Sequence, residues 1–111
     1  MARYFMVVEA NCTDPKREKE FNDWYTNAHI PDVAEVPGLI RATRFKVNKE
    51  LMGKAQAKYL ALYEIEAESY ETWEKTVLEN LTKKGPERGM GEGLASVAAQ
   101  IVYKEISSFT K

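Results

Sequence analysis

The sequence contains very few of the side chains from which disulfides and metal sites are built. Among its 111 residues there is one cysteine, Cys12, and one histidine, His29. A single thiol cannot form an internal disulfide, and one imidazole with one thiol gives no recognisable set of metal ligands. We therefore expect no metal ion, and we expect the reducing environment of the cytoplasm for an unpaired thiol.

Long apolar runs and an excess of one charge are also missing. No stretch is apolar over the length that crosses a bilayer, and the N-terminus shows no signal-peptide pattern. The 16 basic side chains are balanced by 17 acidic ones, so no basic excess exists to neutralise a phosphate backbone. We expect a cytoplasmic protein that binds neither membranes nor nucleic acids.

What the chain does contain is typical of a folded domain. Hydrophobic residues make up 44% and charged residues 30% of the sequence, which are ordinary proportions for a globular protein. A chain of this length has room for one core, so residues 1–111 are expected to form a single domain. An apolar face left uncovered on so small a domain would favour oligomerisation.

Four segments have the aromatic and β-branched composition of β-strands. The strands are predicted at roughly Arg3 to Glu9, Leu39 to Val47, Lys58 to Ile65 and Val97 to Ile106. The polar stretch Asn48 to Gln56, between the second and third strands, is expected to be a loop.

A first helix is predicted between the first and second strands. Thr13 or Asp14 is a suitable N-cap, and Pro15 suits the first helical position because its missing N–H costs nothing there. Pro31 disfavours the α conformation in the residue before it, so we expect this helix to end near His29.

A second helix is predicted after the third strand. Ser69 is its expected N-cap. The glycine-rich stretch Lys83 to Gly93 that follows is predicted to be a mobile loop that could gate a pocket. Helical spacing turns four apolar side chains inward: Tyr70, Trp73, Val77 and Leu81.

The order of these elements, βαββαβ, indicates an α+β fold of the ferredoxin-like type. Such a fold has a four-stranded antiparallel sheet with both helices on one face. The other face would carry the alternate residues of the strands, which are largely apolar here. An uncovered apolar sheet invites a second copy, so we expect a homodimer whose two sheets pack as a dimeric α+β barrel.

The first helix and the segment after it contain a motif. Its parts are Phe21-Asn22-Asp23-Trp24-Tyr25, His29-Ile30-Pro31-Asp32 and Val36-Pro37-Gly38-Leu39. This pattern resembles the EthD-like families of the dimeric α+β barrel superfamily, in which a helix ending in Trp-Tyr is followed by His-x-Pro and then by Pro-Gly. The resemblance covers about Phe21 to Phe45.

The resemblance implies a small cytoplasmic homodimer with a hydrophobic pocket between helix and sheet in each subunit. The relatives include polyketide cyclases, lyases, isomerases and monooxygenases that need no cofactor, as well as haem-degrading enzymes. The resemblance therefore indicates the architecture of the protein but does not identify one reaction.

His29 is the best candidate for chemistry, because its unperturbed pKa lies near neutrality and allows it to act as acid or base. A place just past a helix C-terminus would favour the protonated ring. Asp32 or Tyr25 could orient the ring or share its proton. The structural alternative is a capping histidine that bonds to the last carbonyls of the helix.

Other residues are candidates for binding a substrate. Trp24 and Tyr25 lie on or near the inward face of the helix, where the Tyr25 hydroxyl could donate to a substrate oxygen, and Asn22 lies nearby. Packing in the core explains the two aromatic residues as well.

The strands supply further candidates. Tyr63 and Tyr103, together with Tyr59, have the spacing that would line an aromatic interior suited to a flat or apolar ligand. Arg44 could hold a carboxylate if it faces inward, and otherwise it is a solvated edge charge.

These observations lead to one hypothesis and two alternatives. We expect an enzyme without a cofactor, of the cyclase, lyase or isomerase type, which acts on an apolar or aromatic oxygenated small molecule through acid/base chemistry at His29. The first alternative is a non-catalytic dimer that binds a small molecule. The second is a monooxygenase or a haem-handling relative, in which His29 would be the axial ligand.

Overall fold

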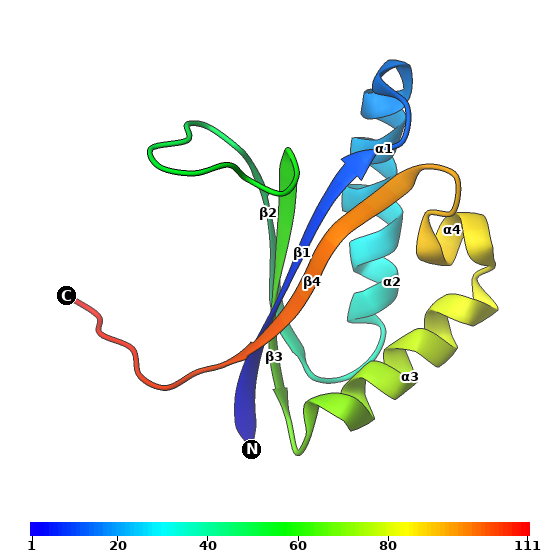
Figure 1. Ribbon diagram of the computed structural model, residues 1–111. Coiled ribbons are helices and arrows are strands. Elements are labelled where there is room, and N and C mark those ends of the chain that lie inside the picture. The colour runs from blue at the N-terminus through cyan, green and yellow to red at the C-terminus, as the bar shows by residue number, and fades with distance from the viewer.

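A four-stranded antiparallel sheet forms one layer of the protein. A computed structural model describes residues 1–111. The strands are β1 (Ala2–Cys12), β2 (Leu39–Lys46), β3 (Tyr59–Ala67) and β4 (Ala95–Lys104), in the spatial order β2-β3-β1-β4. All helices lie on one face of this sheet (Figure 1). The predicted ferredoxin-like α+β fold is confirmed, with small differences at the strand ends.

The second layer consists of two helical segments. A 3₁₀ turn, η1 (Pro15–Arg17), leads into α1 (Glu18–Trp24), and Asp14 caps it by accepting from the Lys16 N–H. The second segment is α3 (Tyr70–Lys83), in which the Ser69 side chain accepts from the Thr72 N–H. Both caps agree with the sequence analysis, because a short polar side chain can satisfy a free N–H at a helix start.

The prediction that the first helix ends at His29 is wrong. A π-helical turn, η2 (Tyr25–His29), follows α1, and α2 (Ile30–Ala34) continues the helical path. The Ile30 N–H reaches back five residues to the Tyr25 carbonyl. This wider turn accommodates Pro31, which has no N–H to contribute, without ending the helix. His29 therefore lies inside a helical run instead of at its C-terminus.

The predicted mobile loop after α3 also contains a helix. Its residues form α4 (Pro86–Met90), with Pro86 at the first helical position. The C-cap is Gly91, whose φ of 67° is in the left-handed region that glycine adopts without strain. The scattered glycines led to the prediction of a loop, but the segment contains a single helical turn that begins at a proline and ends before a glycine.

The core lies between the helices and the sheet. Phe21 from α1 and Ile65 from β3 are completely buried, and Tyr63 is nearly so. The inward orientation of the α3 side chains is confirmed, since each is at most 7% exposed: Tyr70, Trp73, Val77 and Leu81.

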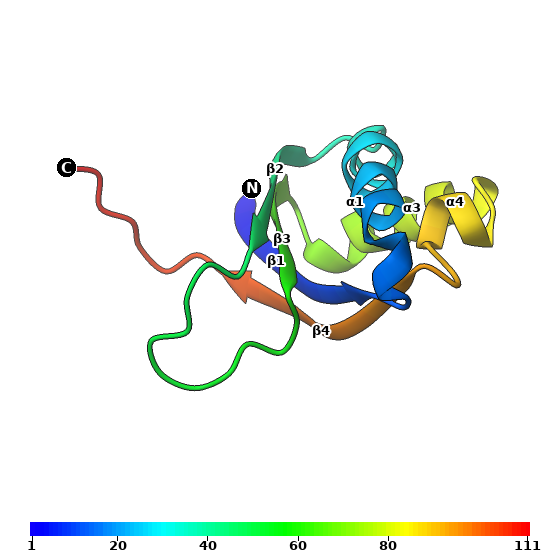
Figure 2. The same cartoon turned by 90° about the horizontal axis from the view of Figure 1, so that it is seen from above.

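The opposite face of the sheet carries no helix (Figure 2). Register places Tyr103 beside Phe5 and Ile101 beside Val7, so these side chains share this open face. Leu62 joins them from β3, opposite Val7. The C-terminal tail and the β2–β3 loop project on the same side, away from the helices (Figures 1 and 2). The centre of the open face is apolar, and charged side chains of Arg3, Glu64 and Glu66 also lie on this face.

We predict that Ser69→Ala lowers the free energy of unfolding by about 1 kcal/mol, because the Thr72 N–H at the start of α3 loses its acceptor. Urea denaturation measures this value. Ser108→Ala, in the exposed C-terminal tail, is the matched control and should stay within about 0.5 kcal/mol of the parent protein. Equal stability of the two variants would contradict the capping role.

Candidate functional site

A cavity of about 430 Å³ lies between the helical layer and the sheet. Eighteen residues line it, and fifteen of them are hydrophobic. The three others are His29, Glu74 and Gln100. An apolar cavity of this size with a few polar groups is typical of a small-molecule site.

The cavity opens along the β4 edge of the sheet. Four of its lining side chains are also substantially exposed, which places them at its mouth: Leu78 (45%), Met90 (49%), Val97 (55%) and Val102 (39%). Met90 belongs to α4, so this short helix forms part of the rim. An apolar molecule could enter here without passing through the core.

His29 contributes its ring to the cavity wall in a defined orientation. Its Nδ1 lies 2.9 Å from the carbonyl oxygen of Gly89. A carbonyl only accepts hydrogen bonds, so Nδ1 carries the proton. In the neutral ring the lone pair is then on Nε2, which has no hydrogen-bond partner within the protein.

The π-turn is the local reason for the position of the ring. In a regular α-helix, residues five apart point about 140° away from each other. Here Trp24 and His29 stack with ring centroids 4.7 Å apart and an angle of 28° between planes. Tyr25 meets the same ring edge-on at 5.0 Å. The wider turn thus brings three aromatic side chains together at the cavity.

Burial lowers the pKa of His29 below its ordinary value. The bond to the Gly89 carbonyl and the charge of Asp32 oppose this shift but do not cancel it. The imidazole is therefore neutral at pH 7, with a basic nitrogen free. The expectation that a helix C-terminus favours the protonated form is wrong, because the helix does not end there.

Two tyrosine hydroxyls form a pair in the same cavity. The Tyr63 hydroxyl donates to that of Tyr25 over 3.3 Å, and both residues line the cavity. Burial raises the pKa of both phenols, so they stay protonated at neutral pH. Since Tyr25 accepts from Tyr63, its own proton remains available to an oxygen atom of a ligand.

Arg44 faces inward, but it lies behind Tyr25 and not in the cavity. Its guanidinium carbon is 4.6 Å from the centroid of the Tyr25 ring, a cation–π contact. One terminal nitrogen donates to the Thr26 hydroxyl at 3.1 Å, whereas Nε and the other terminal nitrogen have no partner. The positive charge opposes the rise in the pKa of Tyr25. The interpretation of Arg44 as a solvated edge charge is corrected.

Asp32 is almost fully buried in α2, at 2% exposure. Its two carboxylate oxygens accept from Nε and Nη2 of Arg88, each at 3.1 Å. The Arg88 guanidinium holds the pKa of Asp32 below its ordinary value. The structure does not bring this carboxylate to the His29 ring by a hydrogen bond, so the predicted orienting contact is replaced by the Gly89 carbonyl.

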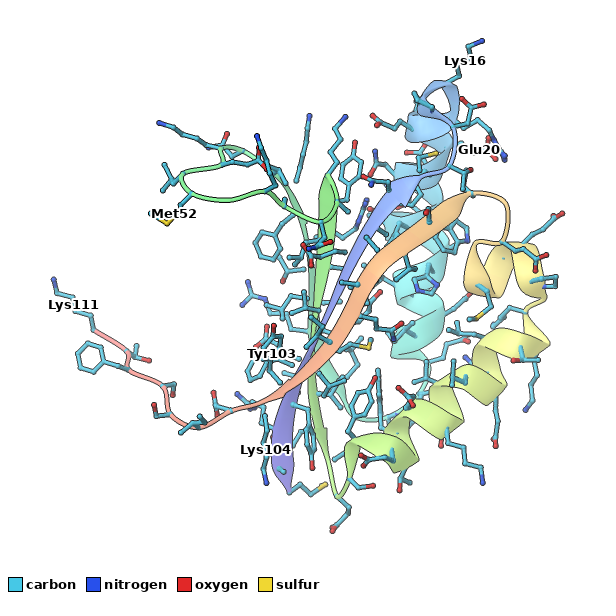
Figure 3. The ribbon with its side chains drawn as sticks, in the orientation of Figure 1. Lys16, Glu20, Met52, Tyr103, Lys104 and Lys111 are labelled. Carbon is cyan, nitrogen blue, oxygen red and sulfur yellow. The ribbon has the colours of Figure 1, made fainter.

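The remaining predicted site residues are divided between the cavity and other places. Trp24 lines the cavity and donates through Nε1 to the Arg88 carbonyl at 2.7 Å. Asn22 donates to the Tyr59 hydroxyl outside the cavity. Tyr103 lies on the open face of the sheet, away from the helices (Figure 3). Its grouping with Tyr63 is corrected, because strand spacing alone does not show which face a residue occupies.

Several residues of the cavity were not predicted as a site. Trp73 and Glu74 from α3, and Met90 from α4, all line it. From the strands, Gln100 and Met6 contribute, and the Gln100 amide donates to the Met6 sulfur at 3.2 Å. The helical spacing of α3 did indicate an inward Trp73, but only the packing of the layers shows that a cavity is left beside it.

No three side chains among His, Cys, Asp and Glu come together in a way that could hold a metal ion. None of the helices has both the length and the apolar character of a membrane-spanning segment.

The fold and the cavity define the class of this protein as a ferredoxin-like α+β domain with a largely apolar ligand-sized site. The chain belongs to the family described as "Domain of unknown function (DUF4286)", whose profile matches residues 6–95. No curated protein sequence matches the chain.

Solved structures support the same fold. HapK from Hahella chejuensis superposes with a TM-score of 0.70 at 15% identity, over 97% of each chain. An EthD family protein from Bacillus halodurans has a TM-score of 0.62 at 18% identity, over 96% of this chain and all of the other. A candidate monooxygenase from Shewanella loihica has a TM-score of 0.56 at 16% identity, over 96% and 97%. At these identities the comparison shows the fold alone.

Because His29 is the only histidine, its titration can be followed directly by NMR. We expect a midpoint below the usual value of about 6.5. The unfolded chain then binds this proton at a higher pH than the folded protein, so the free energy of unfolding falls as the pH drops from about 6.5 through the midpoint. A midpoint at or above the usual value would contradict the assigned environment. His29→Gln should flatten this part of the stability profile.

Proposed function

We propose that the protein is an enzyme that moves a proton next to a carbonyl group of an apolar or aromatic small molecule, without a cofactor. The observation that carries this proposal is the state of His29. Its Nδ1–H is engaged by the Gly89 carbonyl, which leaves a basic Nε2 free in a cavity with largely apolar walls. An imidazole that is neutral at pH 7 and has a free lone pair can act as a general base.

The tyrosine pair supplies the second element of the mechanism. As Nε2 of His29 takes the proton from the carbon, the electron pair of the C–H bond moves toward the carbonyl carbon and the oxygen becomes an enolate. The Tyr25 hydroxyl, which accepts a hydrogen bond from Tyr63, donates to that oxygen. A preorganised donor is worth more in a site with little water than in solution.

The same enolate leads to each reaction of the cyclase, lyase or isomerase type. Return of the proton to another carbon gives an isomer, attack of the enolate carbon on a second carbonyl closes a ring, and expulsion of a leaving group gives an elimination. The apolar walls protect such an intermediate from water. The structural similarity to an EthD family protein and to a candidate monooxygenase is consistent with small-molecule chemistry in this fold.

The reaction class can be tested before the natural substrate is known. Aryl β-diketones are incubated with the protein in D₂O, and the loss of the proton between the carbonyls is followed by NMR. The protein should accelerate exchange, and His29→Gln should lower the enzyme-dependent rate by about 10²-fold. Tyr25→Phe should lower it as well, because the enolate oxygen loses its donor.

Tyr103→Phe is the matched control, since it removes a hydroxyl from the open face of the sheet, and it should exchange like the parent protein. Equal rates for the parent and His29→Gln would rule out this base. Saturable binding of the diketone without accelerated exchange would favour the alternative, a non-catalytic small-molecule binder.

The open face of the sheet supports a second part of the proposal, a homodimer. The single chain exposes 7646 Å², whereas a folded monomer of 12.7 kDa exposes about 6,200 Å². The excess is larger than the roughly 800 Å² that each partner buries in a standard interface. Ile101 and Tyr103 on the open face remain 44% and 53% exposed.

Two projecting segments border this face. The β2–β3 loop exposes Leu51 and Met52 at 86% and 97%, and the C-terminal tail exposes Ile106 and Phe109 at 98% and 90%. Both segments project away from the helices, with Met52 and Lys111 marking their ends (Figure 3). Exposed apolar side chains in two segments that border the same sheet face are consistent with a second copy packed against that face.

We predict that sedimentation gives a mass of twice 12.7 kDa for the parent protein. Ile101→Glu should give the monomer mass, because a charge would be buried between the sheets. Leu78→Glu, similarly exposed but on α3, should remain a dimer. A monomeric parent protein at micromolar concentration would contradict the proposed interface.

A further inference from the structure

The short helix α4 contacts the end of α1 and the π-turn through two consecutive backbone carbonyls. The Arg88 carbonyl accepts from Nε1 of Trp24 at 2.7 Å, and the Gly89 carbonyl accepts from Nδ1 of His29 at 2.9 Å. The rings of Trp24 and His29 stack at the cavity wall, and the N–H group of each ring is bonded to the same turn of α4. The position of α4 decides whether His29 has an acceptor for its proton.

An ion pair holds α4 in this position. The guanidinium of Arg88 binds both oxygens of Asp32 at 3.1 Å. Lys84 adds a more distant contact to Asp32 at 3.7 Å and a closer one to Glu35 at 2.9 Å. Because Asp32 belongs to α2, directly after the π-turn, the pair fixes α4 to the helical run that carries His29.

Close packing against α3 also fixes α4. A Cβ atom on Gly89 would lie 2.0 Å from the carbonyl oxygen of Leu81, a distance at which the backbone must move. A Cβ on Gly91 would meet the Trp24 ring at 2.4 Å. Glycine at these two positions allows α4 to approach both neighbours closely enough for its carbonyls to reach the rings.

We propose that Arg88 and Gly89 are positioning residues for the base: by holding α4 against the π-turn they keep the proton of His29 on Nδ1 and the lone pair on Nε2. The tautomer of a histidine is set by the bond that its other nitrogen makes. If α4 moves away, Nδ1 loses its acceptor and the proton is free to occupy Nε2, where it would block the base.

The proposal gives Asp32 a role that differs from a direct contact with the imidazole. Its carboxylate acts through Arg88 and the α4 backbone. It also connects the state of the base to the mouth of the cavity, because Met90 at the rim follows Gly89 directly in α4. The same position of α4 therefore places Met90 at the rim and gives Nδ1 of His29 its acceptor.

The test uses the full-length protein labelled with ¹⁵N and needs no substrate. Nitrogen NMR of the sole histidine at about pH 8, where the ring is neutral, distinguishes the two tautomers. The parent protein should show the proton predominantly on Nδ1. Arg88→Met should shift the population toward Nε2–H, whereas Arg3→Met, which breaks an exposed ion pair with Glu66, should leave it unchanged.

Two further variants keep the result interpretable. Gly89→Ala should give the same shift as Arg88→Met, because the added Cβ displaces α4 without removing a charge. Arg88→Lys, which keeps the charge but not the two-pronged bond, should restore the Nδ1–H state in part. A folded Arg88→Met protein with an unchanged tautomer would overturn the proposal, and so would an unchanged tautomer in Gly89→Ala.

The proposal rests on the proposed function in that it treats His29 as the base, and the two fail in different ways. If the proton transfer is absent but the tautomer depends on Arg88, only the function is wrong. If exchange of the diketone depends on His29 but the tautomer does not respond to α4, only the positioning role is wrong. When both hold, Arg88→Met should lower the exchange rate by roughly tenfold or more, because in the wrong tautomer Nε2 carries a proton and its lone pair has moved to Nδ1.

Discussion

The hydrogen bond from Nδ1 of His29 to the Gly89 carbonyl is the interaction on which the site depends. It joins two segments 60 residues apart in the sequence and determines where the imidazole can accept a proton. The bond exists because the π-turn rotates His29 toward the cavity and because α4 approaches closely through Gly89. An acceptor that cannot donate fixes the tautomer without adding a charge to an apolar environment.

The balance of burial and charge follows from the same arrangement. His29 is partly buried and receives no direct carboxylate, so the effect of burial dominates and its pKa is lowered. The carboxylate of Asp32 is bound by Arg88, and the effect of its charge on the pKa of the imidazole is smaller than the effect of burial. If Asp32 had bonded directly to the ring, its negative charge would have raised the pKa of the imidazole.

The two faces of the sheet differ in what covers them. The helix-covered face carries the cavity and its polar groups, with Tyr63 from β3 and Gln100 from β4. The open face carries apolar side chains such as Ile101 and Tyr103 together with the charged Glu64, and none of these three lines the cavity. This division follows from the alternation of side chains along each strand, since a shift of one residue transfers a side chain from one face to the other. Tyr63 and Tyr103 are both strand tyrosines, yet they lie on opposite faces.

The sequence by itself determined the order of the four strands and the two longer helical segments, the caps at Asp14 and Ser69, and the inward face of α3, because these features depend on local propensity and periodicity. It could not determine that the helix passes Pro31, since a π-turn has no simple sequence pattern. Nor could it show that α4 supplies the acceptor for His29 or that Arg88 takes the Asp32 carboxylate. Those contacts join distant parts of the chain, and only the packing of α3 and α4 against the first helical run decides which groups meet.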